Sequence, residues 1–171
     1  MTFRELKIAV RKALLELQKD YGLKSVPVID ADQMKKQGRV ETGIYYRVLD
    51  PKNHGWQGRS YNIQGKDAGH VESQHYEVMF QFSVISSESN TEAIDIAAET
   101  QMIASSLPFV DKLLKMGIGV QRPTAIRTLG FINEQDNYDV EASFDVNVTF
   151  NRSIKPNTAA LDGKAVEIKA I

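Results

Sequence analysis

Residues 138–150 read YDVEASFDVNVTF, an alternation of apolar and polar side chains over the whole stretch. In an extended chain successive side chains point to opposite faces. One face therefore receives Tyr138, Val140, Ala142, Phe144, Val146, Val148 and Phe150. The other face receives Asp139, Glu141, Ser143, Asp145, Asn147 and Thr149. The pattern predicts a strand with one side in the core. The other side carries carboxylates and no base, and its role needs an explanation.

The three carboxylates Asp139, Glu141 and Asp145 are the strongest candidates for carboxylate chemistry. Alternate residues of a strand share a face, and oxygen ligands in that arrangement can hold a hard cation. The stretch lacks a glycine-turned loop and a partner base, and an acid/base pair needs two different environments to separate its pKa values. A solvated face, or a face that meets a partner, agrees better with this sequence than a metal or acid/base site.

Further extended segments accompany this strand. Residues 75–86, HYEVMFQFSVIS, alternate in the same way, and residues 43–49, GIYYRVL, have high strand propensity. Residues 26–29 and 122–132 also read as extended, and the turn NEQDN after the latter predicts an antiparallel hairpin with 138–150.

Helical spacing of apolar residues predicts an amphipathic helix over residues 3–20, ended by Gly22. A second helix follows Ser89, which has the capping-box spacing with Glu92, and Pro108 is expected to end it. Residues 109–116 predict one or two further helical turns, closed by Gly117 and Gly119. The expected fold is α+β: one domain over residues 1–171, with an antiparallel sheet, two main helices on one of its faces, and long hairpin strands.

Two segments show no clear element. Residues 50–70 carry four glycines and no apolar period, which predicts a long polar loop. Loops of more than about 12 to 15 residues are uncommon in compact domains unless they are functional or disordered. The tail over residues 154–171 is rich in turn formers until AVEIKAI at 165–171, which alternates and predicts a short edge strand.

Composition and charge narrow the function classes. The formal net charge is −1, so no global field draws the chain to nucleic acid or to a membrane. Residues 1–40 nevertheless hold nine Lys/Arg against five Asp/Glu, and residues 128–151 hold five acids and no base. Cysteine is absent, which excludes disulfides and thiolate chemistry, and no run approaches the roughly 20 apolar residues that span a bilayer. We expect a soluble protein that is not exported and does not contact a membrane.

A search for catalytic groupings is negative at the level of sequence. His54, His70 and His75 do not have the spacing of a helical metal pair, and the chain has no nucleophile elbow. The glycine-rich residues 55–60 lack the spacing of a phosphate loop. Arg4, Lys7 and Arg11 form a basic stripe on the first helix that is able to meet phosphates, although most such stripes are solvated. We expect no enzyme activity and no cofactor.

The predicted strands are long for a chain of this size. Thirteen extended residues span about 43 Å at roughly 3.3 Å each, whereas a compact domain of this length has a radius of gyration of about 15 Å. Ordering a residue costs about 1 to 2 kcal/mol in backbone entropy, so strand ends that project beyond the core need something to cover them. A neighbouring subunit is the simplest candidate.

The order of these segments resembles that of the neck or tail terminator proteins of long-tailed bacteriophages. The resemblance runs from the first helix through GIYYRVL, QHYEVMFQFSVIS and NTEAIDIAAETQMIASSL to LLKMGIGVQRPTAIRTLGFINEQDNYDVEASFDVNVTFNRS and VEIKAI. It rests on order, length and the glycine-rich exit from the helix, not on a chemical motif.

The resemblance implies a homo-oligomeric ring, commonly a hexamer, which caps the tail tube, ends tail assembly and joins the tail to the head connector. It implies a virion component made in the host cytoplasm, with the tail tube protein, the connector and transiting DNA as partners. The interface or lumen candidates are then Asp139, Glu141, Asp145, Arg4, Lys7 and Arg11. The candidates for axial contacts, in the predicted loop, are Trp56, Arg59 and Tyr61.

Other functions remain open at this point. Within phage structure, a tail-tube or head-completion protein has the same general character. From other classes, the sequence leaves a metalloenzyme that uses Asp139, Glu141 and Asp145, or a small-ligand module in which the polar loop covers Tyr45 and Trp56.

Overall fold

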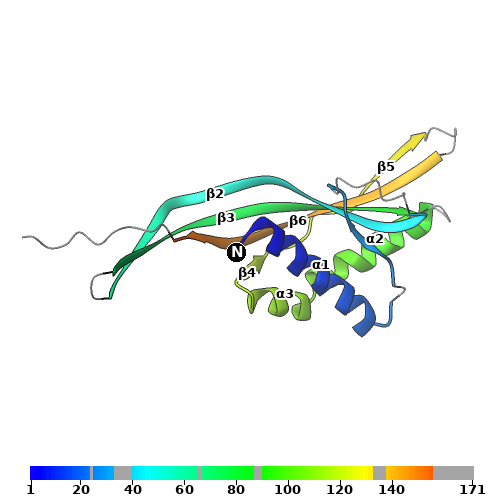
Figure 1. The fold of residues 1–171 in the computed structure, drawn as a ribbon. Coiled ribbons are helices and arrows are strands. Elements are labelled where there is room, and N and C mark those ends of the chain that lie inside the picture. Colours follow the sequence, from blue (N-terminus) through cyan, green and yellow to red (C-terminus); the bar gives the residue numbers. More distant parts are fainter. Residues whose placement is uncertain (24, 33–39, 65–66, 87–89, 133–137, 156–171) are drawn as a thin grey trace, which may run out of the picture.

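A layer of three helices lies on one face of a six-stranded sheet in the computed structural model, which describes residues 1–23, 25–32, 40–64, 67–86, 90–132 and 138–155 (Figure 1). The strands are antiparallel except for one parallel pair. This confirms the predicted α+β fold and the placing of the helices on one face.

The strand predicted from YDVEASFDVNVTF is β6, Tyr138–Ile154, and it lies at the centre of the sheet. On one side it pairs with β3, Asp67–Ser86. On its other side it pairs with β5, Arg127–Ile132, and with β4, Ile118–Val120. The hairpin of β5 and β6 is the antiparallel pair that the sequence predicts.

The far side of β3 pairs with β2, Thr42–Gln64, and β2 pairs in parallel with the short β1, Val28–Asp30. β4 was not expected, because the glycines at 117 and 119 suggested a turn. Gly119 lies directly opposite Thr149, and a Cβ atom at residue 119 would stand 2.5 Å from its Oγ1 atom. The glycine therefore permits close pairing of two strands here.

The apolar face of β6 is in the core. Ala142, Phe144, Val146, Val148 and Phe150 are buried. The ring of Phe144 stacks on that of Phe82 of β3 at 5.3 Å between centroids. Burying one such side chain stabilises the fold by roughly 1.5 to 3 kcal/mol. The side chains of Tyr138 and Val140 lie outside the described part of the chain.

The first helix, α1, runs over Phe3–Asp20 as predicted. Thr2 caps it: its hydroxyl accepts from the backbone N–H of Glu5, whose carboxylate accepts from the backbone N–H of Thr2. Gly22 follows the helix at a φ of +66°, in the left-handed region where glycine is favoured.

The second helix, α2, runs over Asn90–Ser105, and α3 runs over Leu107–Leu114. Pro108 does not end α2, as the sequence suggested, but lies in the first turn of α3, which Ser106 caps. A proline is tolerated there because the first amides of a helix have no intrahelical acceptor. The expected capping box at Ser89 lies outside the described residues.

The predicted polar loop over residues 50–70 is wrong, because this segment forms the outer part of a long hairpin. Both β2 and β3 continue past the helix layer, and their backbone pairing runs to Gln64 and Asp67. We call residues 53–64 and 67–75 the arm. Residues 51–60 are all exposed, so this part of β2 has no buried side and shows no period of two. This is why a strand was mistaken for a loop.

The predicted edge strand at 165–171 lies outside the described residues. Within the described helices, none is long and apolar enough to cross a membrane.

Candidate assembly surfaces

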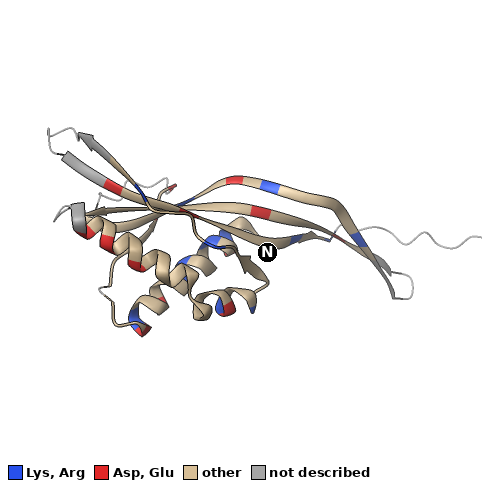
Figure 2. Cartoon of the chain, turned by 180° about the vertical axis from the view of Figure 1, so that it is seen from behind, with Lys and Arg blue, Asp and Glu red and all other residues tan. Residues whose placement is uncertain are grey.

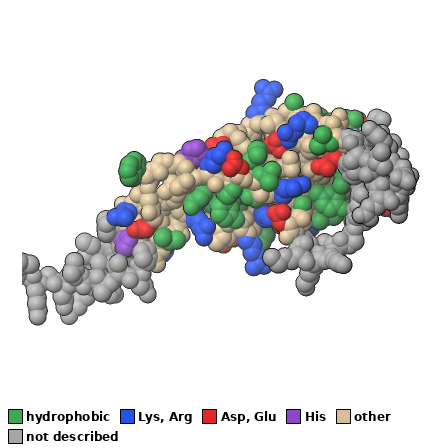
Figure 3. Space-filling view, turned by 90° about the horizontal axis from the view of Figure 1, so that it is seen from above, with side chains coloured by type: hydrophobic (Ala, Val, Ile, Leu, Met, Phe, Trp, Pro, Cys, Tyr) green, Lys and Arg blue, Asp and Glu red, His purple; other side chains and the backbone are tan. Residues whose placement is uncertain are grey.

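Acidic and basic residues are interspersed along most described elements (Figure 2). One element departs from this mixture. The segment that forms α2 carries Glu92, Asp95 and Glu99 and no lysine or arginine. The outer face of the sheet, opposite the helices, is also mixed: apolar, acidic and basic side chains lie next to one another on it (Figure 3).

The acidic face of β6 is part of this outer sheet face, but it is not a solvated carboxylate row. Asp145 is only 7% exposed, which contradicts the solvated interpretation for this residue. Glu141 is half-buried, and Ser143 between them is buried. The backbone of Asp139 pairs with Phe131, but its side chain is outside the described part. Two carboxylates with a serine between them are all that the structure shows of the predicted row.

A base compensates Asp145. Arg127 of β5 donates from Nη2 to Oδ2 of Asp145 at 2.6 Å, and the guanidinium remains 54% exposed. The other carboxylate oxygen, Oδ1, is buried and accepts no hydrogen bond from the described residues. The sequence analysis missed this pair because Arg127 stands one position outside the acidic stretch 128–151. The antiparallel register of β5 on β6, in which Arg127 pairs with Ser143, brings it next to Asp145.

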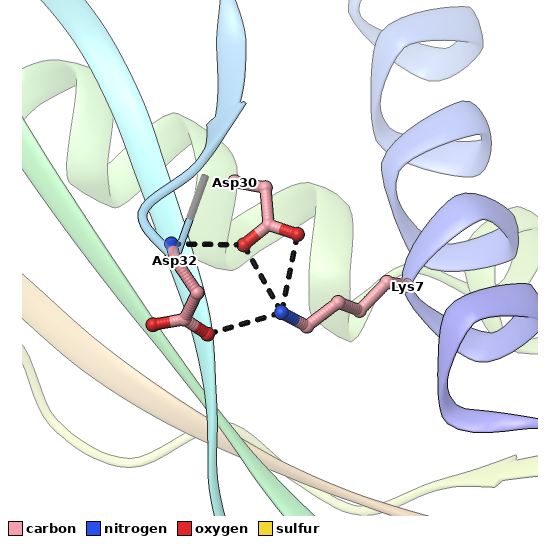
Figure 4. Close-up of polar contacts among 3 residues, drawn as sticks. All are labelled: Lys7, Asp30 and Asp32. Atoms are coloured by element: carbon pink, nitrogen blue, oxygen red, sulfur yellow. Dashed lines mark hydrogen bonds and ion pairs between the residues drawn. The ribbon is translucent and has the colours of Figure 1, made fainter. Parts of the chain in front are cut away.

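The basic stripe of α1 is also largely compensated within the chain. Lys7 donates to Asp30 at 3.1 Å and to Asp32 at 3.0 Å (Figure 4). Its side chain is only 20% exposed. Arg11 donates from Nε to the backbone carbonyl of Val28 at 2.7 Å. Arg4 is exposed. Of the three predicted cations, two therefore attach α1 to β1 and to the residues that follow it.

The environment of Lys7 perturbs its ionisation. Burial by itself lowers the pKa of Lys7, but the hydrogen bonds with Asp32 and Asp30 outweigh it, and the pKa is raised. The charged form is thus favoured in the fold, as expected for an ammonium group that two carboxylates share. This cluster serves the packing of α1, and it has an excess of one negative charge.

Trp56, the first of the predicted axial-contact residues, lies on the arm and is 98% exposed. Here the register of β2 shifts: His54 pairs with His75 and Gly58 with Ser73, so Gly55, Trp56 and Gln57 lie opposite the single residue Gln74. Gly55 has a φ of +69°. Such a bulge bends a strand and redirects a side chain.

Arg59, the second predicted residue of this group, pairs from Nε with Glu72 of β3 at 3.2 Å. Gln57 donates to the same carboxylate at 2.7 Å. Arg59 remains 59% exposed. Tyr61 lies in β2 opposite His70, but its side chain is outside the described residues. Polar bonds between the two strands therefore hold the arm where apolar packing is missing.

A pocket of about 310 Å³ lies where the end of α1 meets the end of α2, and the sequence analysis did not identify it. Its lining residues are Tyr21, Leu23, Glu99, Met102, Ile103 and Ser106. Met102 is 71% exposed and Tyr21 is 49% exposed. Large exposed apolar side chains that gather at a pocket mark a surface for interaction. Spacing of apolar residues could not show it, because the pocket joins two helices.

No group of three or more potential metal ligands is present among the residues that the structure describes. The carboxylates Glu141 and Asp145 thus do not form such a site with any described neighbour.

A protein-family model described as E217 gateway protein gp29 matches residues 5–160 of the chain. The matched range takes in all six described strands, α2, α3 and nearly all of α1. Among curated proteins, none matches the chain.

Proposed function

Because the chain belongs to the E217 gateway protein gp29 family, it is a structural protein of a phage virion, and we propose that it forms a ring in the neck. In this proposal six copies cap the tail tube, end tube assembly and join the tail to the head connector. DNA passes through the lumen of the ring without sequence-specific contacts. The partners are further copies of the chain, the tail tube protein and the connector.

The observation that carries this proposal is the arm. Residues 51–60 are exposed throughout, although they are ordered into a strand. Backbone ordering costs about 1 to 2 kcal/mol per residue. The pairing of β6 with β3 ends at Glu72, and a two-stranded hairpin such as the one beyond it is at best marginally stable. A second surface that covers the arm in the assembled particle would offset this cost. Projecting arms are typical of subunits whose contacts are completed by assembly.

The compensated charges agree with a passage for DNA. Lys7 and Asp145 were candidates for the lumen wall, and each is paired within its own subunit. This pairing leaves one net negative charge at the Lys7 cluster and none at the pair of Arg127 and Asp145. A wall with so few net charges has a weak field, so it neither binds phosphates strongly nor repels them over long distances. The word gateway in the description of the family also suits a component through which DNA passes.

This role requires no catalytic centre, and we propose that the chain is not an enzyme. A tail-tube protein is the nearest structural alternative. Its subunits stack without limit, whereas the proposed terminator forms one ring and stops.

The decisive experiment measures assembly. Native mass spectrometry and electron microscopy of the purified chain, alone and with its tail tube protein, are expected to show a ring and tubes with one capped end. Phages that lack this chain are expected to produce tails of abnormal length or tails without heads. A chain that stays monomeric at high concentration and leaves tube growth unchanged contradicts the proposal, and a chain that polymerises alone into long tubes identifies a tube protein.

A further inference from the structure

The most exposed aromatic residue of the described chain has no packing partner in its own subunit. Trp56 is 98% exposed, although tryptophan is on average a highly buried residue type. Tryptophan is also enriched among the residues that dominate binding energy at interfaces. We propose that Trp56 inserts into the pocket between α1 and α2 of a second copy of this chain. This inference rests on the proposed ring and names the contact that links its subunits.

Hydrogen bonds to the bulge fix the backbone next to Trp56. Gln74 donates from Nε2 to the carbonyl of His54 at 2.7 Å and to that of Gly55 at 3.3 Å. These carbonyls belong to the last paired residue before the bulge and to the first residue of the bulge, so one side chain holds the bulge from the opposite strand. Gly55 takes up the left-handed turn that a side chain would disfavour. A tryptophan on a fixed backbone loses little freedom when it binds, which favours tight association.

The pocket has the size and the lining for an indole ring. An apolar cavity of about 150 Å³ is sufficient to hold one benzene molecule. The pocket of about 310 Å³ is roughly twice as large. Leu23, Met102 and Ile103 supply apolar contacts, and methionine adapts its shape and makes favourable contacts between sulfur and aromatic rings. The carboxylate of Glu99 on the same lining is an acceptor for the indole N–H, which needs one when it is buried.

The charges on the segment around Trp56 and on the rim of the pocket are of opposite sign. The segment 53–59 around Trp56 contains no acidic residue and carries Arg59, whose guanidinium is 59% exposed. On the receiving side, Glu99 lines the pocket, and the α2 segment has acids but no base. Opposite charges across an interface steer association and fix its register. Arg59 pairs with Glu72 of its own subunit, but its guanidinium stays 59% exposed. The approach of this guanidinium to the acidic rim is therefore favoured over the contact of two arms with each other.

The occupant is a second copy because the arm cannot reach the pocket of its own subunit. Figure 1 shows the β2–β3 hairpin leaving the helix layer on the side where α1 begins, whereas the pocket lies at the end of α1. A contact in which one patch meets a different patch of the next copy is heterologous, and it gives a ring when the rotation between successive copies closes. Both halves of the contact are present on one chain, which is the requirement for such an assembly.

Crosslinking tests the contact directly, since the chain has no cysteine of its own. We combine Trp56→Cys with Met102→Cys in the full chain and treat the assembled protein with a short bis-maleimide. The expected product is a ladder of covalently linked copies up to the full ring, while each single variant gives no ladder. The matched control pairs Trp56→Cys with Leu129→Cys, because Leu129 is also exposed but lies on β5, and it is expected to give no ladder.

A second measurement avoids dependence on the crosslinker. Trp56→Ala and Met102→Glu are each expected to weaken ring formation at least about 30-fold, the effect of losing an interface hot spot, while Leu129→Ala does not. Both altered side chains are exposed, so monomer melting temperatures are expected to stay unchanged.

The outcomes separate this inference from the proposed function. If rings form but the 56–102 pair gives no ladder and Trp56→Ala assembles normally, the inference is wrong and the ring proposal stands. If Trp56→Ala forms rings but no longer binds the tail tube protein or the connector, Trp56 contacts that partner and the inference is again wrong. If the unmodified chain forms no ring alone or with its tube, the proposed function fails, and this contact fails with it.

Discussion

The two halves of the β2–β3 hairpin are built from the same strands and are stabilised in different ways. Over the helices, Val78, Phe80, Phe82 and Val84 of β3 are fully buried. Beyond the contact of Tyr76 with Phe150, whose rings stack at 5.8 Å, residues 51–60 of β2 are exposed and residues 70–74 of β3 are half-buried. Polar bonds link the two strands there. The inner half thus supplies the apolar burial that stabilises the subunit, and the outer half contributes little of it. Substitutions in the two halves should therefore act on different measurements.

The largest effect on stability is expected in the inner half. Phe82 is 1% exposed, and its ring packs on Tyr46, Phe80 and Phe144. We expect Phe82→Ala to lower the free energy of unfolding by about 3 to 5 kcal/mol, because it removes apolar burial and leaves a cavity. Chemical denaturation of the monomer measures this change. A loss below about 1 kcal/mol would contradict the assignment of this layer to the core.

The next largest effect is expected from the pair of Arg127 and Asp145, on the face of the sheet opposite the helices. We expect Arg127→Ala to cost about 1 to 3 kcal/mol, because it leaves the carboxylate of Asp145 buried without its base; the value is reduced because Arg127 is 54% exposed. Arg127→Lys should retain part of the stability, since it keeps the charge. Double-mutant cycles with Asp145→Asn give the coupling energy. Coupling near zero would show that the pair is incidental.

Arg127 and Asp145 also show which features of the fold the sequence can predict and which it cannot. The period of two in 138–150 predicted the core face of β6 correctly, because burial on one side leaves a readable alternation. The same alternation said nothing of Arg127, since a contact between paired strands depends on register, which the sequence of one strand does not contain. The expectation of a phage structural protein is confirmed by the family match, whereas the terminator role remains a proposal.

The arm was wrongly predicted to be a loop, and the pocket was not predicted, each for a physical reason. Residues 53–60 are exposed, so no buried face imposes a period of two on them, and a strand of this kind resembles a loop in sequence. Hydrogen bonds along the backbone ladder form it instead, and they are independent of side-chain type. The pocket at Met102 arises from the packing of α2 against the end of α1, and helical spacing on either helix alone cannot reveal it.

A smaller effect is expected where α1 meets β1. The pKa of Lys7 is raised in the fold, so its contribution is complete below the ordinary lysine pKa of about 10.4 and is lost as the pH rises through the higher folded value. We expect this contribution to be about 0.5 to 1 kcal/mol. Unfolding measured from pH 8 to pH 12 should show a loss of stability in the unmodified chain and a smaller loss in Lys7→Met. Equal slopes for the two proteins would mean that the cluster with Asp30 and Asp32 does not stabilise the fold.

The smallest effect on the subunit is expected from the arm. Trp56→Ala should change the free energy of unfolding of the monomer by less than about 0.5 kcal/mol, as is usual for surface positions, because the side chain makes no buried contact. Replacing Gln74 by alanine should likewise leave the core intact, although it removes the bonds that hold the bulge. Thermal melting of dilute monomer measures both, with Phe82→Ala as the positive control. If Trp56→Ala instead destabilises the monomer as strongly as a core substitution does, the arm is part of the folding unit, and the division between the two halves of the hairpin is wrong.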